Sequence, residues 1–405
     1  MKIRKITTIR LKSRPNLLWL QLETEDGLKG LGEIWRGTSA VEAVIHDDMA
    51  SWLFTQDPDD IELISRTFTT PYVGYHSSSA ETRAASAVDI ALWDLKGKRL
   101  GTPVYNLLGG RSRENIPVYN TCSGYSFNAS AGNFNSGSSR RIITDKDRSV
   151  GPYDDQIAFM RDAGALAESL VSEGYSAMKI WPFDTYAKKS GGYRISLEEL
   201  KEGLIPFKKI RERVGDKIEV MCELHNLWSL PAAERIMEGL KEYDIFWAED
   251  PLCKMDDIKG VRALKEKAQV PICGCESIGS SVTFRQLLEE HCFDYLMMDL
   301  GWCGGITEAR KTAYLAESYN IPVSPHDCTG PVLLMAGLHL GLHAGNAIFQ
   351  EVVRANLDSW YPEMVTVLPD IKDGHASLSD APGLGTELRP EVFEREDALI
   401  RVSEA

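Results

Sequence analysis

Residues 218–351 contain six short apolar runs that each end in an acid or a histidine: IEVMCE (218–223), IFWAE (245–249), VPICGCE (270–276), YLMMD (295–299), IPVSPH (321–326) and NAIFQE (346–351). They recur about every 25 residues, a spacing typical of the strand–helix units of a (β/α)8 barrel. The segments between them have helical character, as in PAAERIMEGLKEYD (231–244) and ITEARKTAYLAESYN (306–320). We therefore predict an α/β fold built on a (β/α)8-type TIM barrel.

In such a barrel the carboxyl ends of the strands meet at one mouth. The mouth would receive six side chains, those of Glu223, Glu249, Glu276, Asp299, His326 and Glu351. Each acid taken alone could be a helix N-cap or a solvated carboxylate, but capping does not require the same register six times. Buried carboxylates repel each other unless a cation lies among them. The three strand-end glutamates 223, 249 and 276 are therefore predicted ligands of Mg2+, for which Mn2+ could substitute.

Composition excludes several classes of protein. The chain has 405 residues and a formal net charge of −14, with no basic run, which argues against nucleic acid or an anionic membrane as a partner. Its eight cysteines lack the paired short spacings of a zinc clasp or a disulfide framework, which suits a reducing cytoplasm. We find no signal-peptide pattern and no apolar stretch of membrane-spanning length.

The chain divides into three parts. Residues 1–34 alternate like antiparallel strands, and the pattern becomes helical from about residue 40 to Gly101. Residues 1–115 are thus predicted to form an N-terminal α+β capping domain, and residues 116–360 the barrel with the metal site. The Pro- and Gly-rich segment 361–405 is expected to return to the cap and complete it.

The segment 123–153 is rich in Ser, Gly and Asn and is too long for an ordinary βα loop. It is either a disordered insert or a lid, and the lid is favoured because the loop after the first barrel strand lies on the catalytic face. A lid would make Tyr125, Arg140, Arg141 and Tyr153 candidate substrate contacts.

Two histidines and a lysine add proton-transfer chemistry to the mouth. His225 follows Glu223 by two residues, and Lys179 and Trp181 lie two apart on the second strand, YSAMKIW (175–181). His326 ends the strand next to the one that ends in Asp299, so an Asp–His hydrogen bond is expected to orient the imidazole. A cation bound to a substrate carboxylate would stabilise the enediolate formed when the adjacent C–H is deprotonated. His326 would then be the base, and His225 the acid that protonates a departing hydroxyl.

The chain resembles the mandelate racemase branch of the enolase superfamily over nearly its whole length. The motifs that carry the resemblance are SAVDIALWDLKGKRLGTPVYNLLGG (86–110), WAEDPL (247–252), CGCES (273–277) and MMDLGWCGGITEARK (297–311). ELHNLW (223–228) and SPHDCTGP (324–331) are similar to segments of the dehydratases that act on sugar acids such as galactonate, mannonate or gluconate. The superfamily is a known example of a Lys or His base acting with Mg2+.

The resemblance implies roles for particular residues and carries two departures. Glu351 would contact the substrate carboxylate or the developing enediolate, and Lys179 would support charge. Racemases of the branch have Lys-x-Lys on the second strand, whereas Trp181 stands at the second position here, which argues against a two-base racemase. The first ligand is Glu223 where many relatives have Asp.

Three functions remain open. We favour a Mg2+-dependent dehydratase, a hydro-lyase that converts a sugar acid to a 2-keto-3-deoxy acid. Epimerisation, racemisation or cycloisomerisation through the same enediolate is the second hypothesis, and a non-catalytic sugar-acid-binding homologue the third. Specificity is expected from the cap loops near residues 33–36 and 73–79 and from the 123–153 segment. The expected substrate contacts are Trp35, Arg36, Tyr75 and His76, with Trp181 on the second barrel strand. The resemblance also implies a homo-oligomer.

Overall fold

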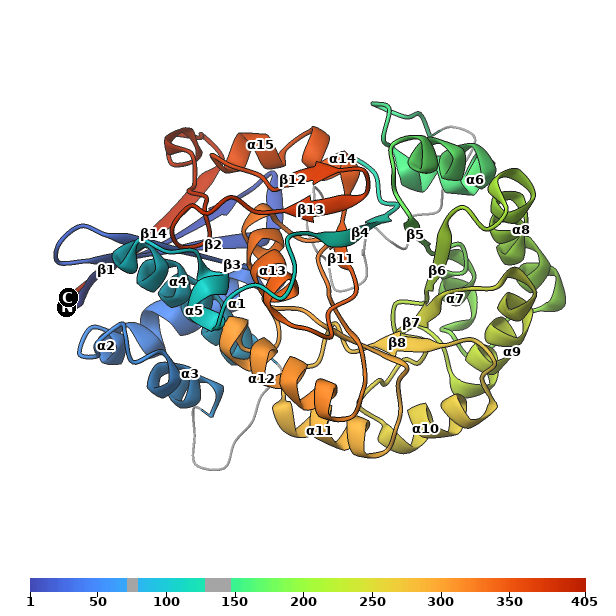
Figure 1. Cartoon of the computed structure of the whole chain (residues 1–405), viewed down its shortest axis with the longest axis horizontal. Helices are drawn as coiled ribbons and strands as arrows, with labels where there is room; N and C mark the ends of the chain where they lie inside the picture. The colour runs from blue at the N-terminus through green and yellow to red at the C-terminus, as the bar shows by residue number, and fades with distance from the viewer. Residues whose placement is uncertain (71–78, 128–146) are drawn as a thin grey trace.

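The computed structural model describes residues 1–70, 79–127 and 147–405. Tyr75, His76, Arg140 and Arg141, which are among the expected substrate contacts, lie outside the described residues. Figure 1 shows the cap at one end of the molecule, with both chain termini, and the barrel at the other.

The cap is a four-stranded antiparallel sheet with helices against it. Its strands are β1 (Ile3–Leu11), β2 (Arg14–Thr24), β3 (Lys29–Trp35) and β14 (Ala398–Glu404), in the order β14-β1-β2-β3. Its helices are α1 (Thr38–Ala43), the π-helix η1 (Val44–Met49), α2 (Ala50–Leu53), α3 (Ile61–Thr69), α4 (Ala80–Leu100) and α5 (Val104–Leu108). The pairing of β14 with β1 confirms that the C-terminal segment completes the cap.

Helix α4 lies so close to β3 that two glycines are required. A Cβ at Gly30 or at Gly32 would lie 2.1 Å from the carbonyl oxygen of Ala91 or of Ala87, respectively. No side chain fits in that space. The alternation of small and apolar residues in β3 therefore fixes how the cap helix packs on the sheet.

Eight parallel strands form the barrel, and regular pairing joins all but one neighbouring pair. They are β4 (Ile116–Thr121), β5 (Ala177–Ile180), β6 (Glu219–Glu223), β7 (Trp247–Glu249), β8 (Ile272–Gly274), β9 (Tyr295–Met298), β10 (Val323–Pro325) and β11 (Gln350–Val352). Strands β4 to β10 pair in chain order, and β11 pairs with β4. Between β10 and the residues that lead into β11, the pairing is an isolated bridge, Val323 to Ala347. Below the mouth the interior is filled by apolar side chains, among them Tyr119, Met221, Trp247 and Met297.

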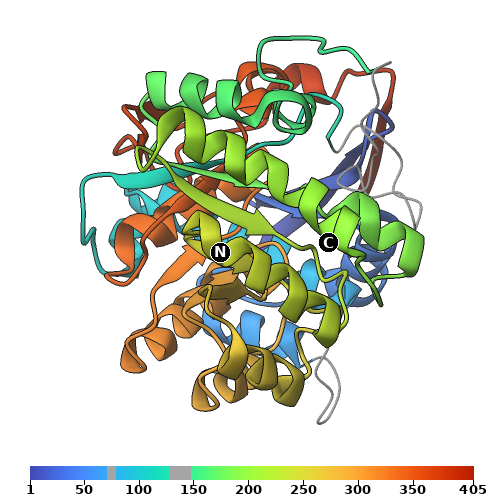
Figure 2. The same cartoon turned by 90° about the vertical axis from the view of Figure 1, so that its right-hand side faces the viewer.

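Helices surround the strands, as expected of the fold (Figure 2). They are α6 (Asp155–Ser172), α7 (Asp184–Ser190), α8 (Leu197–Val214), α9 (Leu230–Leu240), the 3-10 turn η3 (Lys241–Tyr243), α10 (Ile258–Lys267), α11 (Ser281–Glu289), α12 (Gly305–Ser318) and α13 (Pro331–His343). After β11 come α14 (Arg354–Asp358), α15 (Tyr361–Met364), β12 (Asp370–Lys372), β13 (His375–Ser377) and the 3-10 turn η4 (Pro390–Val392). The β12–β13 hairpin pairs with barrel strand β4. The C-terminal segment thus contacts the barrel before its last strand reaches the cap.

The cap meets the barrel through buried polar groups. The carboxylate of Glu33, on β3, accepts hydrogen bonds from the Trp19 indole N–H (2.7 Å) and from the backbone N–H of Val332 (3.2 Å) in the first turn of α13. The Trp93 indole N–H of α4 donates to Thr307 Oγ1 on α12 (2.8 Å). These bonds hold the end of β3 over the barrel mouth.

Candidate active site

Three glutamates from consecutive strands converge at the mouth of the barrel. Glu223 ends β6, Glu249 ends β7 and Glu276 follows β8 by two residues, and an oxygen of each lies within 4.8 Å of the others. Glu223 and Glu249 are fully buried, and Glu223 and Glu276 line the pocket. The set consists only of carboxylate oxygens, which are the donors that Mg2+ prefers.

Burial and mutual repulsion perturb these carboxylates. Burial raises the pKa of Glu223 to about 7, against the attraction of Lys179. Burial and the neighbouring Glu223 raise the pKa of Glu249 well above its usual value. Lys179 Nζ lies 3.3 Å from Glu223 and contacts Glu249, so one ammonium group balances part of their charge. A divalent cation among the three glutamates would balance the rest, and the residues present therefore fit one.

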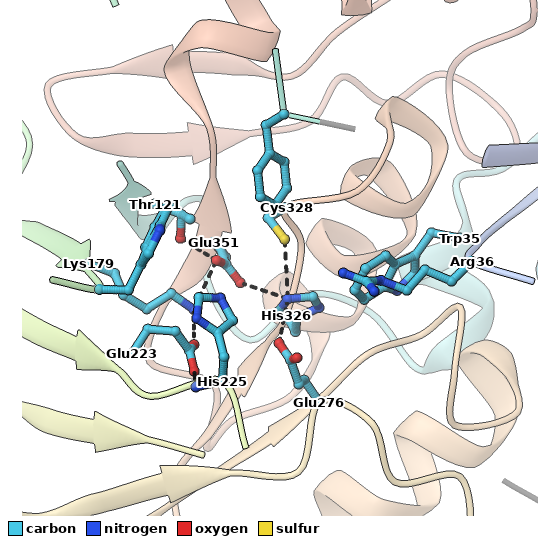
Figure 3. A pocket seen from close by; sticks show the side chains of 12 residues that line it. Trp35, Arg36, Thr121, Lys179, Glu223, His225, Glu276, His326, Cys328 and Glu351 are labelled. Carbon is cyan, nitrogen blue, oxygen red and sulfur yellow. Dashed lines mark hydrogen bonds and ion pairs between the residues drawn. The ribbon is translucent and has the colours of Figure 1, made fainter. Parts of the chain in front are cut away.

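His326 and Asp299 form a buried pair on one side of the pocket. Figure 3 shows His326 there, beside Glu276 and Cys328. His326 Nδ1 lies 2.7 Å from Asp299 Oδ2, and the other carboxylate oxygen accepts the N–H of Gly301 at 2.7 Å. The opposite ring nitrogen, Nε2, lies 2.9 Å from Glu276 and 3.8 Å from Glu351. Burial lowers the pKa of His326, but these two carboxylates outweigh it and raise the value well above 6.5. The same contact keeps the pKa of Glu276 well below its usual value despite burial.

The second histidine, His225, also lines the pocket, on the side of Lys179 and Glu223. Its backbone is left-handed (φ 50°), and its N–H donates to Glu223 Oε1 at 2.6 Å. Its Nδ1 lies 2.9 Å from a carboxylate oxygen of Asp184, which is buried at the start of α7. Trp181 packs edge-on against the imidazole, with ring centroids 5.6 Å apart. The two histidines therefore each have a buried aspartate behind them.

Sequence reasoning missed Asp184. An acid in the first turn of a helix is common, so DTYAKKS (184–190) gives no local sign of a functional role. What connects Asp184 with His225 is the order of the strands. Helix α7 follows β5, and His225 follows the adjacent strand β6. Only the packing of those two loops brings the aspartate to the imidazole.

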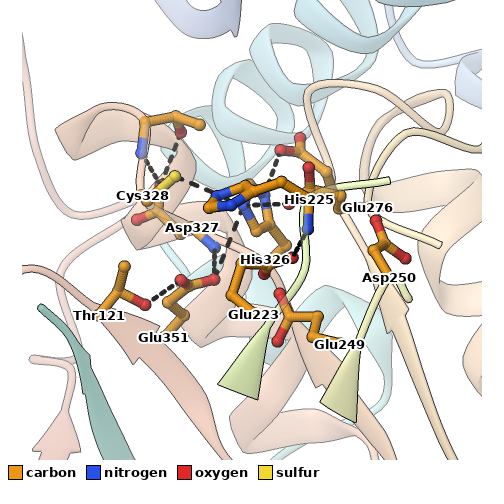
Figure 4. Close-up of polar contacts among 12 residues, drawn as sticks. Thr121, Glu223, His225, Glu249, Asp250, Glu276, His326, Asp327, Cys328 and Glu351 are labelled. Atoms are coloured by element: carbon orange, nitrogen blue, oxygen red, sulfur yellow. Dashed lines mark hydrogen bonds and ion pairs between the residues drawn. The ribbon is translucent and has the colours of Figure 1, made fainter. Parts of the chain in front are cut away.

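Glu351 divides its two oxygens between separate partners (Figure 4). One oxygen contacts Lys179 Nζ (3.0 Å) and the Thr121 hydroxyl, and the other accepts the backbone N–H of Asp327 at 2.9 Å. Burial by itself would raise the pKa of Glu351, but the charges of Lys179 and His326 lower it below its usual value. Glu351 is therefore an anion held in a fixed orientation beside His326.

The cap supplies one wall of the pocket. Trp35 and Arg36 line it together with Trp181, Phe127 and Cys328. The Trp35 indole N–H, however, donates to Asp299 Oδ2 at 2.8 Å, and the Arg36 guanidinium lies over the Trp35 ring at 4.6 Å. The indole N–H of Trp35 is thus engaged by Asp299, while its ring lines the pocket, so the expected contact of Trp35 with substrate stays a prediction.

Two tyrosines of segment 123–153 lie behind the pocket and do not line it. The Tyr125 hydroxyl donates to Asp358 at 3.0 Å and accepts the N–H of Tyr153 at 3.2 Å. Both rings pack against the cluster that contains Phe127 and Cys328. On this side the pocket is lined by Phe127, and the contact of Tyr125 and Tyr153 with substrate stays a prediction.

Comparison with known proteins places these features in a family. A model described as the mandelate racemase / muconate lactonizing enzyme N-terminal domain matches residues 5–109, and a model described as enolase C-terminal domain-like matches residues 162–392. The chain belongs to the mandelate racemase / muconate lactonizing enzyme family. The resemblance and the fold that the motifs predicted are thereby confirmed.

Members of this family that are similar to the chain include characterised and solved proteins. A D-galactonate dehydratase from Pectobacterium atrosepticum is 30% identical over 98% of this chain and 94% of its own length. One from Ralstonia nicotianae is 29% identical over 96% of this chain and 92% of its own length. Two solved enolase-family structures, one from Sargasso Sea environmental sequencing and one from Agrobacterium tumefaciens, are 48% and 40% identical. Each covers this chain completely and 99% of its own, with TM-scores of 0.88 and 0.87.

Across residues 1–70, 79–127 and 147–405, we find no helix with the length and apolar character needed to cross a membrane.

Proposed function

We propose that the protein is a Mg2+-dependent sugar-acid dehydratase that removes water from a 2,3-dihydroxy acid to give a 2-keto-3-deoxy acid. The observation that carries this proposal is the pair of imidazoles, His326 and His225, each backed by a buried aspartate and both lining the pocket that holds three glutamates. Curated relatives with the name D-galactonate dehydratase support the reaction class and favour an aldonate as substrate.

Glu223, Glu249 and Glu276 would hold the cation. When bound, Mg2+ supplies positive charge for the substrate carboxylate and for the enediolate that forms beside it. Glu276 is also one of the two carboxylates that raise the pKa of His326. A cation bound at the metal site would neutralise the charge of Glu276. The pKa of His326 would then fall, and its imidazole could act as a base.

His326 Nε2 accepts the proton from C2 of the substrate. Asp299 fixes the tautomer with the lone pair on Nε2, because its carboxylate accepts from Nδ1. Lys179, buried between Glu223, Glu249 and Glu351, supplies a fixed positive charge beside the developing enediolate. Glu351 is anchored by Thr121 and Asp327 and orients the substrate.

His225 gives its proton to the 3-hydroxyl group as the C3–O bond breaks. The electron pair from C2 forms the C2–C3 double bond, and the hydroxyl leaves as water. The resulting enol becomes the 2-keto acid by tautomerisation, so that one water is lost overall. Asp184 stabilises the protonated form of His225 until that step.

A screen of six-carbon aldonates and aldarates, with Mg2+ and with EDTA, tests this function by the formation of 2-keto acid. We expect turnover only with the cation, and His225→Asn should lose dehydration while keeping exchange of the C2 proton with deuterated water. Exchange in the wild type without keto-acid formation would instead support epimerisation, which two imidazoles in one pocket also suit. Metal-dependent binding with neither reaction would identify a non-catalytic binding protein.

The molecular setting of this activity is also part of the proposal. We assign the cap to residues 1–115, the barrel to 116–360 and the return segment to 361–405. A cytoplasmic homo-oligomer is the form that we expect, in keeping with a small-molecule substrate.

A further inference from the structure

A second group of metal-binding side chains lies on the base side of the pocket. His326 Nε2, Cys328 Sγ and a carboxylate oxygen of Glu351 all lie within 4.8 Å of one another, and all three residues are buried. The sulfur lies 3.5 Å and the nearer oxygen 3.8 Å from the imidazole nitrogen (Figure 3). Cys328 lines the pocket, and none of the proposed steps uses its thiol.

These separations match those between the ligands of a tetrahedral zinc ion. With Zn–N of about 2.0–2.1 Å and Zn–S of about 2.3 Å, tetrahedral angles put nitrogen and sulfur roughly 3.5 Å apart. The same tetrahedral geometry puts nitrogen and a carboxylate oxygen about 3.4 Å apart. The two measured distances from the imidazole nitrogen therefore differ from these values by only a few tenths of an ångström, and the sulfur and the oxygen lie within 4.8 Å of each other.

The backbone holds the three groups in place. Glu351 turns one oxygen to Lys179 and Thr121, which leaves the oxygen that accepts from Asp327 N facing His326. Cys328 follows His326 by two residues. The carboxylate of Asp327, between them, accepts hydrogen bonds from the backbone N–H (3.1 Å) and the hydroxyl (2.6 Å) of Thr329. The loop after β10 thus presents nitrogen and sulfur side by side.

The two sets of ligands differ in chemistry. Three carboxylates suit a hard ion that keeps its waters, whereas imidazole and thiolate suit a borderline or soft ion such as Zn2+ or Cd2+. A coordinated thiol loses its proton to the field of the ion, so a buried neutral thiol is not a barrier to binding. Three protein ligands also leave a fourth position open for water or a substrate oxygen.

We propose that His326, Cys328 and Glu351 form a second cation site, selective for Zn2+ over Mg2+, whose occupation inhibits the enzyme by binding the nitrogen that would accept the substrate proton. The inhibition rests on the proposed function, but the site itself does not. It would link activity to the supply of a thiophilic metal while Mg2+ stays at the three glutamates.

Cadmium tests the site without turnover. Added to the full-length protein in excess Mg2+, Cd2+ should give one thiolate-to-metal charge-transfer band per chain in the ultraviolet, and Zn2+ should displace it. Cys328→Ser should abolish the band, and His326→Asn should weaken Cd2+ binding by about ten-fold or more. The matched control is Cys253→Ser, which removes an exposed thiol that belongs to neither group of ligands and should leave the band unchanged.

Zinc inhibition tests the consequence. With Mg2+ saturating, Zn2+ should inhibit the wild type and Cys253→Ser alike, and Cys328→Ser should need at least about ten-fold more Zn2+ relative to its own uninhibited rate. A Cd2+ band that survives in Cys328→Ser, or that excess Mg2+ removes, would overturn the site. A protein with the Cys328-dependent band but no turnover of any sugar acid would keep the site and refute the dehydratase.

Discussion

At the scale of the residue, the pocket is defined by what lies behind each imidazole. Asp299 accepts from both His326 and Trp35, and Asp184 lies against His225. Neither aspartate lines the pocket. The contact of Asp299 with Nδ1 orients the imidazole of His326, and the carboxylate of Asp184 lies 2.9 Å from Nδ1 of His225. Three predictions belong at this scale.

His326→Asn should abolish exchange of the C2 proton, because asparagine keeps a polar group of similar size but cannot accept a proton. We expect a loss of about two to four orders of magnitude, measured as deuterium incorporation by NMR. Mg2+ affinity, measured by calorimetry, should change little. Retained exchange would refute the role of His326 as the base.

Asp184→Asn should slow dehydration by about one to two orders of magnitude while sparing C2 exchange. The amide cannot stabilise the protonated His225 that the departing hydroxyl needs. Product formation and deuterium exchange, followed in the same sample, separate the two steps. Equal losses in both would mean that Asp184 supports the fold of the site and not the acid.

Glu249→Gln should lower Mg2+ affinity and turnover together, by at least about ten-fold each. The amide keeps the shape of the side chain but removes one of the three negative charges around the ion. Calorimetric titration with Mg2+ measures the affinity. Undiminished affinity would put the ion elsewhere.

At the scale of the element, helix α13 carries a buried histidine that makes stability depend on pH. His339 Nδ1 accepts the N–H of Tyr105 at 3.2 Å, and burial lowers the pKa of His339 to about 4. Above pH 6.5 the imidazole is neutral in both states. Below that value the unfolded chain takes up the proton first, so the folded state loses stability as the pH falls towards 4.

His339→Gln should reduce this acid sensitivity. In the wild type the group accounts for up to about 3 kcal/mol of unfolding free energy lost between pH 6.5 and 4. Urea unfolding across that range measures the slope in both proteins. The variant can be less stable at pH 7 through lost packing, but its slope should be shallower, and an equal slope would contradict the assignment.

The same scale shows what the sequence could and could not predict. The strand ends from Glu223 to Glu351 were predictable because side-chain alternation and strand–helix spacing are local properties that the barrel converts into a shared mouth. The cap strands were predictable from the same alternation. Asp184 and the indole of Trp35 were not, because their partners lie on other elements and no local pattern records such contacts.

At the scale of the whole molecule, the two chain ends form one sheet, since β14 pairs with β1. Removing residues 398–405 should expose the edge of β1 and loosen the cap. We expect a lower melting temperature and reduced turnover, because β3 of the same sheet carries Trp35 and Arg36. Scanning calorimetry and the keto-acid assay measure both effects.

The barrel ligands supply the control for that truncation. Mg2+ affinity should fall less than turnover, since the three glutamates lie on or just after barrel strands, which belong to a different sheet from β14. Unchanged turnover would show that the cap sheet does not need its fourth strand.

The last residue of strand β3, Trp35, donates a hydrogen bond to Asp299, the aspartate behind His326. A chimera that grafts the cap of one relative onto the barrel of another therefore exchanges more than a substrate wall. It also replaces the donor that sets the electron density on that carboxylate, so selectivity and proton-abstracting power would be inherited together. Directed evolution of new substrates in this scaffold should accordingly vary Arg36 first and leave the tryptophan before it untouched.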